Sequence, residues 1–274
     1  MDVTLFQALV LGVVQGLSEF LPISSSGHLI LVPWLFGWPE HGLTFDLALH
    51  LGTSAALLAY FWRDWVDLIR AVLSGLVNAK ARASHEWNMA WLIVIGCIPA
   101  GIVGVLFQDF VEGTLRHAYL LIGILLVLFG VLLLLADRYG PRSRTLATIS
   151  LIDALVIGCA QVLALSPGVS RSGITMTAGL FRGLDRPAAA RFSFLLSAPI
   201  TIAAALFKLK DLVKTPPVGA ELLAFMVGVL AAAIVGALAI SFMLNYLRRQ
   251  SVALFFWYRL VVGLAVIGLA LAGR

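Results

Sequence analysis

Six stretches of this chain are long, apolar and nearly free of charge, and they restrict what it can fold into. Each has about 20 residues or more, enough for a helix that crosses roughly 30 Å of hydrocarbon. No water is present at that depth to bond the backbone, so each stretch is predicted to be an α-helix. The stretches are residues 43–62, 88–108, 117–136, 187–208, 219–242 and 252–272.

Composition argues against the soluble alternatives. Hydrophobic residues make up 61% of the chain, charged residues only 12%, and the mean hydropathy is +1.01. A buried bundle in a large soluble protein would need more polar surface than this. The net charge of +5 does not indicate nucleic-acid binding, because the basic residues lie in short loops, and we expect no nucleic-acid partner. The sequence predicts an all-α multi-pass membrane protein.

A polar, glycine-rich pattern interrupts the apolar chain twice. It reads Gly-x-x-Gln-x-Leu, then a proline, then Ser-x-Ser-Gly, over residues 12–27 and again over 158–173, 146 positions later. The apolar arm before the first break, residues 3–18, is only about 24 Å long as a helix, too short to span comfortably. Polar backbone at this depth is tolerated only where it lines a protein cavity. Each copy therefore predicts a re-entrant helical hairpin.

The two hairpins are predicted to enter from opposite faces. Three of the apolar stretches lie between them, an odd number, so the second copy is inverted relative to the first. We therefore expect about six transmembrane helices plus two re-entrant hairpins in one integral membrane domain. Its pseudo-repeat halves run over about 1–136 and 147–274.

Loop charges orient this arrangement. One assignment places twelve Lys and Arg residues on the cytoplasmic side and five on the other side, as the positive-inside rule favours. Both termini and the mouth of the first hairpin then face outward. Lys208, Lys210 and Lys214 on the outer side run against the rule. The cytoplasmic segments are 63–87, 137–147, 182–191 and 243–251.

The second break has the residues of an anion cradle. Arg171 is always charged and presents a planar fork of donors that suits phosphate or carboxylate. Ser170 and Ser172 surround it with hydroxyls, and Thr175 follows within one helical turn. If a helix begins near Ser172 or Gly173, its free amides also favour an anion.

The first break has the residues of a reactive complement. Gln15 and Glu19 are four apart and share one face of a helix. A carboxylate beside a phosphate cradle needs a bridging cation, which suggests Mg²⁺ or Ca²⁺ on oxygen ligands. The hydroxyls of residues 24–26 and the imidazole of His28 follow, and hydroxyl, imidazole and carboxylate are the parts of an activated nucleophile. The two breaks together predict phosphoryl-group hydrolysis within a membrane.

Structural interpretations stay open for each of these residues. Glu19 and Arg171 can form a buried ion pair without chemistry, the hydroxyls of residues 24–26 can serve helix packing, and His28 can be a hydrogen-bonded interfacial histidine. Asp46 and His50 lie one helical turn apart and are as consistent with packing as with lining a site.

Two further ionisable residues are expected to serve the fold. Arg259 lies near the start of the last apolar stretch, where snorkelling or a structural pair is favoured over chemistry. Asp153 opens an arm of the second hairpin and is expected to be a helix-start residue.

A transporter is the alternative function from another class. Inverted repeats with broken helices are also how many secondary transporters build their sites. A lipid-phosphate or anion transporter would need Arg171 but neither a nucleophile nor a metal-binding carboxylate. The presence of Glu19, Ser25 and His28 therefore favours an enzyme.

Two motifs resemble a known family. Residues 15–28, QGLSEFLPISSSGH, are similar to its (E/Q)xxxE segment with the trailing Ser-rich Gly-His, and residues 167–175, PGVSRSGIT, to its PGxSRSxxT segment. The family is undecaprenyl-diphosphate phosphatase, the bacitracin-resistance protein of bacteria. The resemblance extends over nearly the whole chain and includes residues 192–196 and 258–259.

The resemblance implies hydrolysis of undecaprenyl diphosphate to the monophosphate and inorganic phosphate, which recycles the lipid carrier of cell-wall synthesis. It also implies a divalent cation, a bacterial inner-membrane location, a site open to the periplasmic side and a homodimer. Glu19 would bind metal or act as a base, and Ser25 or His28 would be nucleophile or base, with attack by Ser25 favoured. The diphosphate-binding residues would be Ser24, Ser26, Ser170, Arg171, Ser172 and Thr175.

One position departs from the family pattern. Many members have Glu where this chain has Gln15, so a cage of two carboxylates around the metal is in doubt. Glu19 would then be the critical metal ligand, with Gln15 beside it.

Overall fold

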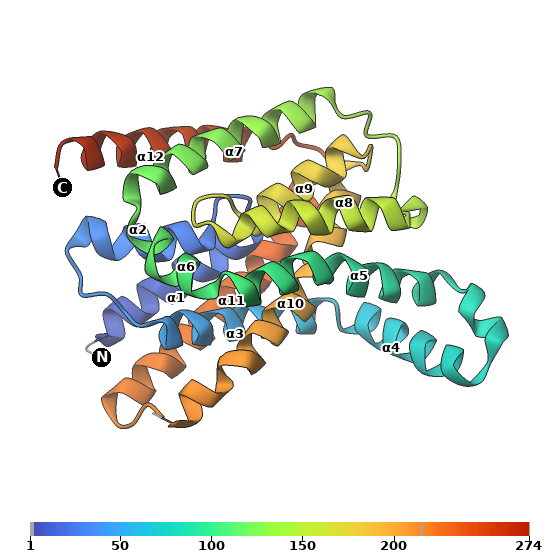
Figure 1. The fold of residues 1–274 in the computed structure, drawn as a ribbon, viewed down its shortest axis with the longest axis horizontal. Helices are drawn as coiled ribbons and strands as arrows, with labels where there is room; N and C mark the ends of the chain where they lie inside the picture. The colour runs from blue at the N-terminus through green and yellow to red at the C-terminus, as the bar shows by residue number, and fades with distance from the viewer. Residues whose placement is uncertain (1–2, 215, 274) are drawn as a thin grey trace.

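A computed structural model describes residues 3–214 and 216–273, and it is built from α-helices with short 3₁₀ turns. Six of the described helices are long and apolar enough to cross a membrane, which confirms the predicted fold class. They lie on the six predicted stretches, and Figure 1 shows them running roughly along the long axis of the molecule or slanting across it. The six are α3 (Leu43–Tyr60), α5 (His85–Leu106), α7 (Tyr119–Tyr139), α10 (Arg186–Lys214, apolar over Arg186–Ala204), α11 (Ala220–Leu247) and α12 (Ala253–Leu271).

Each glycine-rich break separates two short helices. The first lies between α1 (Leu5–Phe20) and α2 (Ser25–Phe36), the second between α8 (Leu151–Val162, then η4, Leu163–Leu165) and α9 (Arg171–Phe181). A serine caps the second helix of each pair: Ser24 has φ 79° and Ser170 has φ 76°. Their hydroxyls accept hydrogen bonds from the amides of Gly27 (3.3 Å) and Gly173 (3.1 Å). The repeat in the sequence is thus a repeat of backbone geometry.

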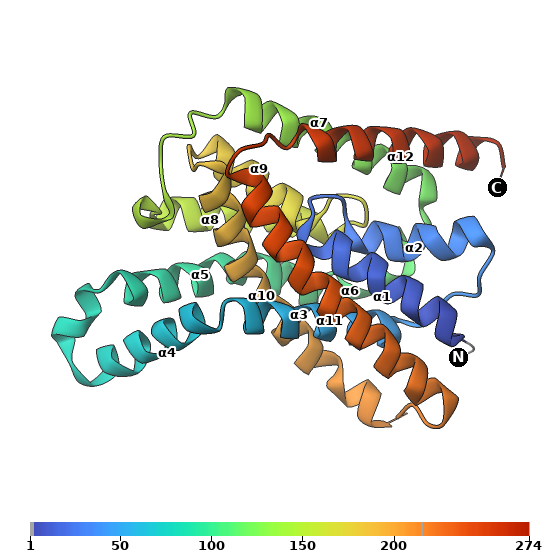
Figure 2. The ribbon, with the colours of Figure 1, turned by 180° about the vertical axis from the view of Figure 1, so that it is seen from behind.

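The two breaks meet inside the molecule. The α1–α2 pair opens toward the end that holds both chain termini, and the α8–α9 pair opens toward the other end (Figures 1 and 2). Between them the amide of Gly168 donates to the hydroxyl of Ser24 over 3.0 Å. The hairpins therefore enter from opposite ends, as an inverted repeat requires.

The halves of the repeat are interleaved. Helix α1 packs on α11 of the second half, and α8 packs on α5 of the first half. Small residues allow this approach: a Cβ on Gly12 would lie 2.4 Å from the carbonyl oxygen of Gly228, and one on Gly158 would lie 2.3 Å from that of Gly96. Gly12 and Gly158 are equivalent positions of the two copies. Helices α7 and α12 lie side by side (Figures 1 and 2).

Much of the segment 63–87, assigned to a cytoplasmic loop, is helical. It holds α4 (Trp62–Val77) and η1 (Ala79–Ala83), and α4 packs on α5 to form an arm that projects from the body (Figure 1). Apolar Leu68 is buried while Asp67 and Arg70 are exposed. Charged residues alternate with apolar ones in this segment, so its average hydropathy does not indicate a helix. The helical spacing of its apolar residues would have indicated one. The remaining connections contain α6 (Gln108–Gly113), η2 (Leu115–His117) and η3 (Leu146–Thr148).

Ion pairs anchor the start of α8. The carboxylate of Asp153 binds Arg144 at 2.6 Å and Arg182 at 2.7 Å. It also closes a capping box with Ser150, which confirms its expected place at a helix start. Burial raises the pKa of this carboxyl, but the hydrogen bonds from Arg144, Arg182 and Ser150 outweigh burial and hold the pKa below its usual range.

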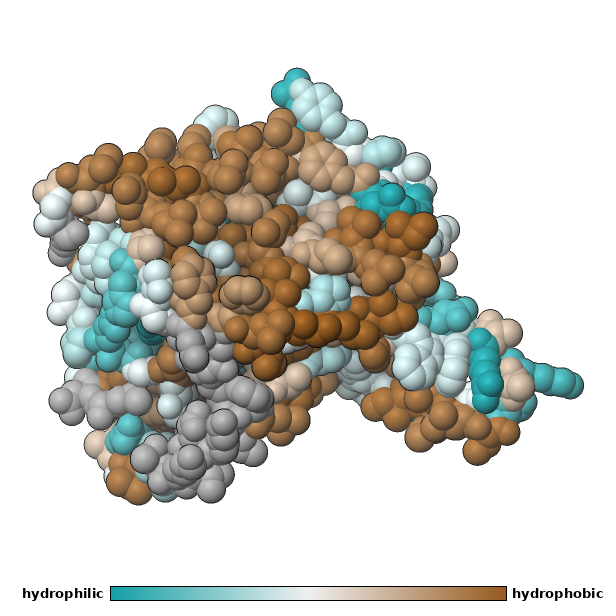
Figure 3. Space-filling view, in the orientation of Figure 1, coloured by the Kyte–Doolittle hydropathy of each residue, from teal (hydrophilic) through white to brown (hydrophobic). Residues whose placement is uncertain are grey.

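The outer surface suits a bilayer. Large apolar side chains point outward from the long helices, among them Leu128 on α7, Leu238 on α11 and Val261 on α12. In Figure 3 hydrophobic residues cover the middle of the visible face, and hydrophilic residues gather mainly toward its two ends. The chain is a multi-pass membrane protein.

Candidate active site

A cavity of about 320 Å³ lies beside the two breaks. Its polar wall combines residues from both repeat copies: Glu19, Ser25 and Ser26 from the first, Gln161 and Arg171 from the second. Asp46 and His50 on α3 and Thr201 on α10 complete it. The rest of the wall is apolar and consists of Leu43, Leu47, Ala100, Ala164, Leu165, Ile200 and Ala204.

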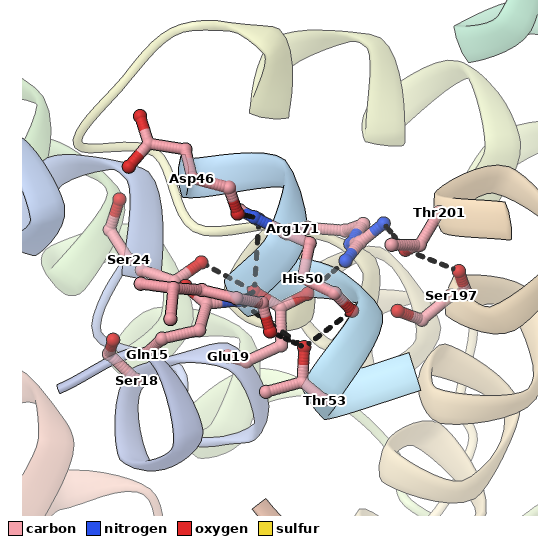
Figure 4. A network of polar contacts seen from close by, with 12 residues as sticks. Gln15, Ser18, Glu19, Ser24, Asp46, His50, Thr53, Arg171, Ser197 and Thr201 are labelled. Carbon is pink, nitrogen blue, oxygen red and sulfur yellow. Dashed lines mark hydrogen bonds and ion pairs between the residues drawn. The ribbon is translucent and has the colours of Figure 1, made fainter. Parts of the chain in front are cut away.

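Glu19 is the centre of the polar contacts. One carboxylate oxygen is ion-paired with Arg171, and the other accepts a hydrogen bond of 2.6 Å from the hydroxyl of Ser25. The side chain of Glu19 is 5% exposed, so its charge depends on these partners rather than on water. Figure 4 shows the side chains of Glu19, from the first repeat copy, and Arg171, from the second, pointing toward each other.

Ser25 and Arg171 occupy the same place in the two repeat copies. Each is the first residue of a helix and follows a serine with positive φ, a conformation that is costly for residues other than glycine. The inverted repeat therefore brings the first residues of two helices, a hydroxyl and a guanidinium, to the same carboxylate. The helix begins at Arg171, one residue before Ser172 and two before Gly173, the two starts that the sequence suggested.

Arg171 has a second partner that the sequence did not indicate. Its Nη1 donates to the hydroxyl of Thr201 over 2.6 Å, and Thr201 in turn donates to the carbonyl of Ser197 over 2.8 Å (Figure 4). Thr201 is a hydroxyl in a long apolar stretch, where packing is the ordinary interpretation. No local pattern distinguishes it.

Gln15 and Glu19 share one helix face, as predicted. The Nε2 of Gln15 donates to Glu19 (3.1 Å) and to Thr53 (3.3 Å), while its Oε1 has no partner among the described residues. Within residues 3–214 and 216–273 no group of three His, Cys, Asp or Glu side chains is arranged to hold a metal ion. Mg²⁺ usually takes one or two carboxylates plus substrate phosphates, and Glu19 is the carboxylate at the two breaks that such a cation would use.

His28 lies apart from the cavity. It is buried, its Nδ1 is 2.8 Å from the carbonyl oxygen of Ser24, and its Nε2 is 2.8 Å from the hydroxyl of Tyr258 on α12. Both ring nitrogens are therefore engaged, and no hydrogen bond joins His28 to Glu19 or Ser25 among the described residues, so a catalytic role for His28 stays a prediction.

The imidazole at the carboxylate belongs to His50. Its Nε2 is 3.6 Å from Glu19, and its Nδ1 is 2.8 Å from the carbonyl oxygen of Asp46. His50 and Asp46 both line the cavity, so the site-lining alternative holds for them. Asp46 is also ion-paired with Arg116 and His41, each at 2.6 Å.

Of the residues expected to bind substrate, Ser26 and Arg171 line the cavity. The others make contacts within the fold, because a broken helix leaves amides and carbonyls that need partners. Ser24 and Ser170 cap helices, Ser172 donates to the carbonyl of Leu21, and Thr175 donates to that of Arg171 and pairs with Ser193. None of these four is a lining residue of the cavity, so direct substrate contact by them stays a prediction.

Arg259 serves the fold, as expected, but by burial rather than snorkelling. It is fully buried on α12 and donates to five carbonyl oxygens. The carbonyls include those of both breaks, so one guanidinium ties the two breaks to α7. They belong to Pro22, Leu125, Leu126, Gly168 and Val169.

Comparisons with known proteins show the family of the chain. Residues 8–265 match the family model described as bacitracin resistance protein BacA. The chain is 53% identical to the undecaprenyl-diphosphatase of Pelotomaculum thermopropionicum over 269 residues, 98% of each protein. It is 52% identical to that of Moorella thermoacetica, over 96% of this chain and 97% of the relative. Identity to that of Thermomicrobium roseum is 48%, over 96% of each.

Proposed function

This chain belongs to the bacitracin resistance protein BacA family and is an undecaprenyl-diphosphatase, and from that premise we propose that Ser25, Glu19 and Arg171 carry out the hydrolysis. The observation that carries the assignment is the shared carboxylate: Glu19 holds both the Ser25 hydroxyl and the Arg171 guanidinium at one cavity. A transporter of anions has no need of the Ser25–Glu19 hydrogen bond.

Ser25 attacks the terminal phosphorus of the diphosphate. Its proton passes to Glu19, whose Oε2 is 2.6 Å from the hydroxyl oxygen, within the reach required of a general base. The new bond joins the Ser25 oxygen to phosphorus, and the bond from phosphorus to the bridging oxygen breaks. Undecaprenyl phosphate leaves with that electron pair. Water then cleaves the phosphoserine, releases inorganic phosphate and restores the serine proton.

Arg171 stabilises the charge on the phosphoryl oxygens. A transferring phosphoryl group spreads negative charge over its equatorial oxygens, and a planar guanidinium matches that arrangement. Thr201 accepts a hydrogen bond from the Nη1 of Arg171, so the orientation of the guanidinium is set before substrate binds. In this proposal, substrate oxygens then replace the carboxylate of Glu19 as the partner of the Nη2.

His50 replaces His28 as the assisting imidazole. Its Nε2 faces Glu19 at 3.6 Å, whereas His28 is engaged with Ser24 and Tyr258. In this role His50 takes the proton of the hydrolytic water or relays that of Glu19.

A divalent cation, Mg²⁺ or Ca²⁺, would be held by Glu19 and the carbonyl of Gln15 together with phosphate oxygens. The unpartnered Oε1 of Gln15 supports this, although the amide must turn to point it at Glu19. When bound, the cation would neutralise charge on the diphosphate.

The apolar wall of the cavity suits a lipid substrate. Leu43, Leu47, Leu165 and Ile200 line the cavity and would contact the first isoprenyl units.

The distribution of Lys and Arg among the loops suits a site that faces outward. By the positive-inside rule, the mouth of the first hairpin is assigned to the periplasmic side. Lys208, Lys210, Lys214 and Arg274 belong to the outer side in this assignment; the side chains of the three lysines, and residue Arg274, lie outside the described residues. A homodimer stays a prediction.

The test is phosphate release from undecaprenyl diphosphate by protein purified in detergent with Mg²⁺ or Ca²⁺. Ser25→Ala and Arg171→Ala are each expected to lower kcat by at least about 100-fold, since they remove the nucleophile and the charge stabiliser. Glu19→Gln should do the same, and chelation of divalent cations should stop wild-type turnover. Acid quenching during turnover should leave phosphate on Ser25.

Two serines serve as controls. Ser26→Ala changes the neighbouring hydroxyl of the same cavity, and Ser18→Ala changes a buried hydroxyl that bonds to the carbonyl of Val14. Phosphate found on Ser26, or near-normal turnover by Ser25→Ala, would refute the assignment of the nucleophile. Ser18→Ala should keep wild-type turnover.

A further inference from the structure

Gln161 is a buried amide that faces the cavity without a hydrogen bond. It lies near the end of α8 and is 2% exposed, and neither its Nε2 nor its Oε1 has a partner among the described residues. Buried polar groups are nearly always paired, because an unpaired one loses its bonds to water without replacement. The position of Gln161 in the cavity wall indicates that its partner comes from the cavity.

The repeat explains why this amide is free. Gln161 is equivalent to Gln15, 146 positions earlier, and Gln15 bonds to Glu19 four residues on. Four residues after Gln161 the chain has Leu165, which offers no polar partner and itself lines the cavity. The second copy therefore has the amide without the carboxylate that accepts its hydrogen bond in the first copy.

We propose that Gln161 binds the substrate: its amide nitrogen donates a hydrogen bond to an oxygen of the diphosphate. The inference rests on the proposed function, because it needs a phosphate group in this cavity. Arg171 lines the same cavity and supplies the charge, and Gln161 adds a directed donor without a second charge. A phosphate oxygen is the acceptor that the Nε2 lacks.

The test is a kinetic and thermal comparison of wild type with Gln161→Leu, a replacement of similar size. Because the lost bond is to a charged group, KM for undecaprenyl diphosphate should rise about tenfold or more, with kcat within about threefold of wild type. Thermal unfolding in detergent should stay at the wild-type Tm or rise, since the change removes an unpaired buried amide and breaks no bond in the fold.

Gln15→Leu is the matched control, at the equivalent position of the other copy. It breaks hydrogen bonds to Glu19 and Thr53, so its Tm should fall and its kcat should fall with it. Gln161→Glu is the second variant. A carboxylate that faces the diphosphate would repel it, so its KM should rise further than that of Gln161→Leu.

A binding measurement separates this inference from the proposed function. In a Ser25→Ala background, the Kd for undecaprenyl diphosphate should be about tenfold weaker with Gln161→Leu than without it. Unchanged KM and Kd, or a lower Tm for Gln161→Leu, would overturn the inference and leave the nucleophile assignment intact. If Ser25→Ala retained full activity, the proposed mechanism would fail while the KM comparison of Gln161→Leu with wild type still decided the role of Gln161.

Discussion

Two imidazoles lie near the first break, and at the scale of single residues their hydrogen bonds give them different roles. His28 is buried and joins Ser24 to Tyr258, so His28→Asn should lower the Tm and reduce activity through the fold. His50 lines the cavity beside Glu19, so His50→Asn should lower kcat about 100-fold at an unchanged Tm. Phosphate release and thermal unfolding, measured on both variants, show which histidine has the structural role and which has the catalytic role.

The opposite result would support the catalytic role, nucleophile or base, that the family motif implies for His28. A His28→Asn variant with wild-type Tm and no turnover, beside an active His50→Asn variant, would contradict the division of labour proposed here.

At the scale of helices, glycine contacts hold the inverted hairpins against the opposite half. Gly158→Ala would place a methyl group 2.3 Å from the carbonyl oxygen of Gly96, and backbone cannot move as a side chain can. We expect the free energy of unfolding of the variant to be about 1–3 kcal/mol lower than that of wild type, the usual cost of overpacking. Thermal unfolding in detergent measures it. Gly268→Ala on α12 is the control, because a Cβ there meets nothing within 4 Å, and equal Tm losses would contradict the packing argument.

At the scale of the whole molecule, the arrangement predicts which side of the membrane each loop occupies. In a background without Cys97 and Cys159, Glu40→Cys should react with a membrane-impermeant maleimide in intact cells. Ser143→Cys should react only after the membrane is opened. The reason is that the positive-inside rule assigns the Arg-rich loop with Ser143 to the cytoplasmic side and the segment with Glu40 to the other side. Labelling in the reverse order would invert the orientation and place the cavity mouth on the cytoplasmic side.

Local patterns were enough for much of this architecture. Apolar length predicted the six spans, the repeated glycine-rich pattern predicted the two breaks, and the odd number of spans between the breaks predicted their inversion. Spacing placed Gln15 and Glu19 on one helix face, and the motif around Arg171 suggested a helix start at Ser172 or Gly173, one or two residues after the observed one. Helix α4 was missed because an average over residues 63–87 conceals periodicity.

Local sequence patterns could not predict which residues of different helices contact one another at the site. Spacing along the chain says which residues share a turn of helix, and it cannot say which of two histidines will face Glu19 from another helix. Packing of α3 and α10 against the hairpins brought His50 and Thr201 to the site, and packing of α12 gave His28 a partner in Tyr258. The sequence by itself determined that this protein crosses the membrane and carries two inverted polar breaks, because length and periodicity are local properties. Only the tertiary structure decided that His50, Thr201 and the unpaired Gln161 line the cavity beside Ser25, Glu19 and Arg171, because contacts between helices distant in the sequence are not a local property.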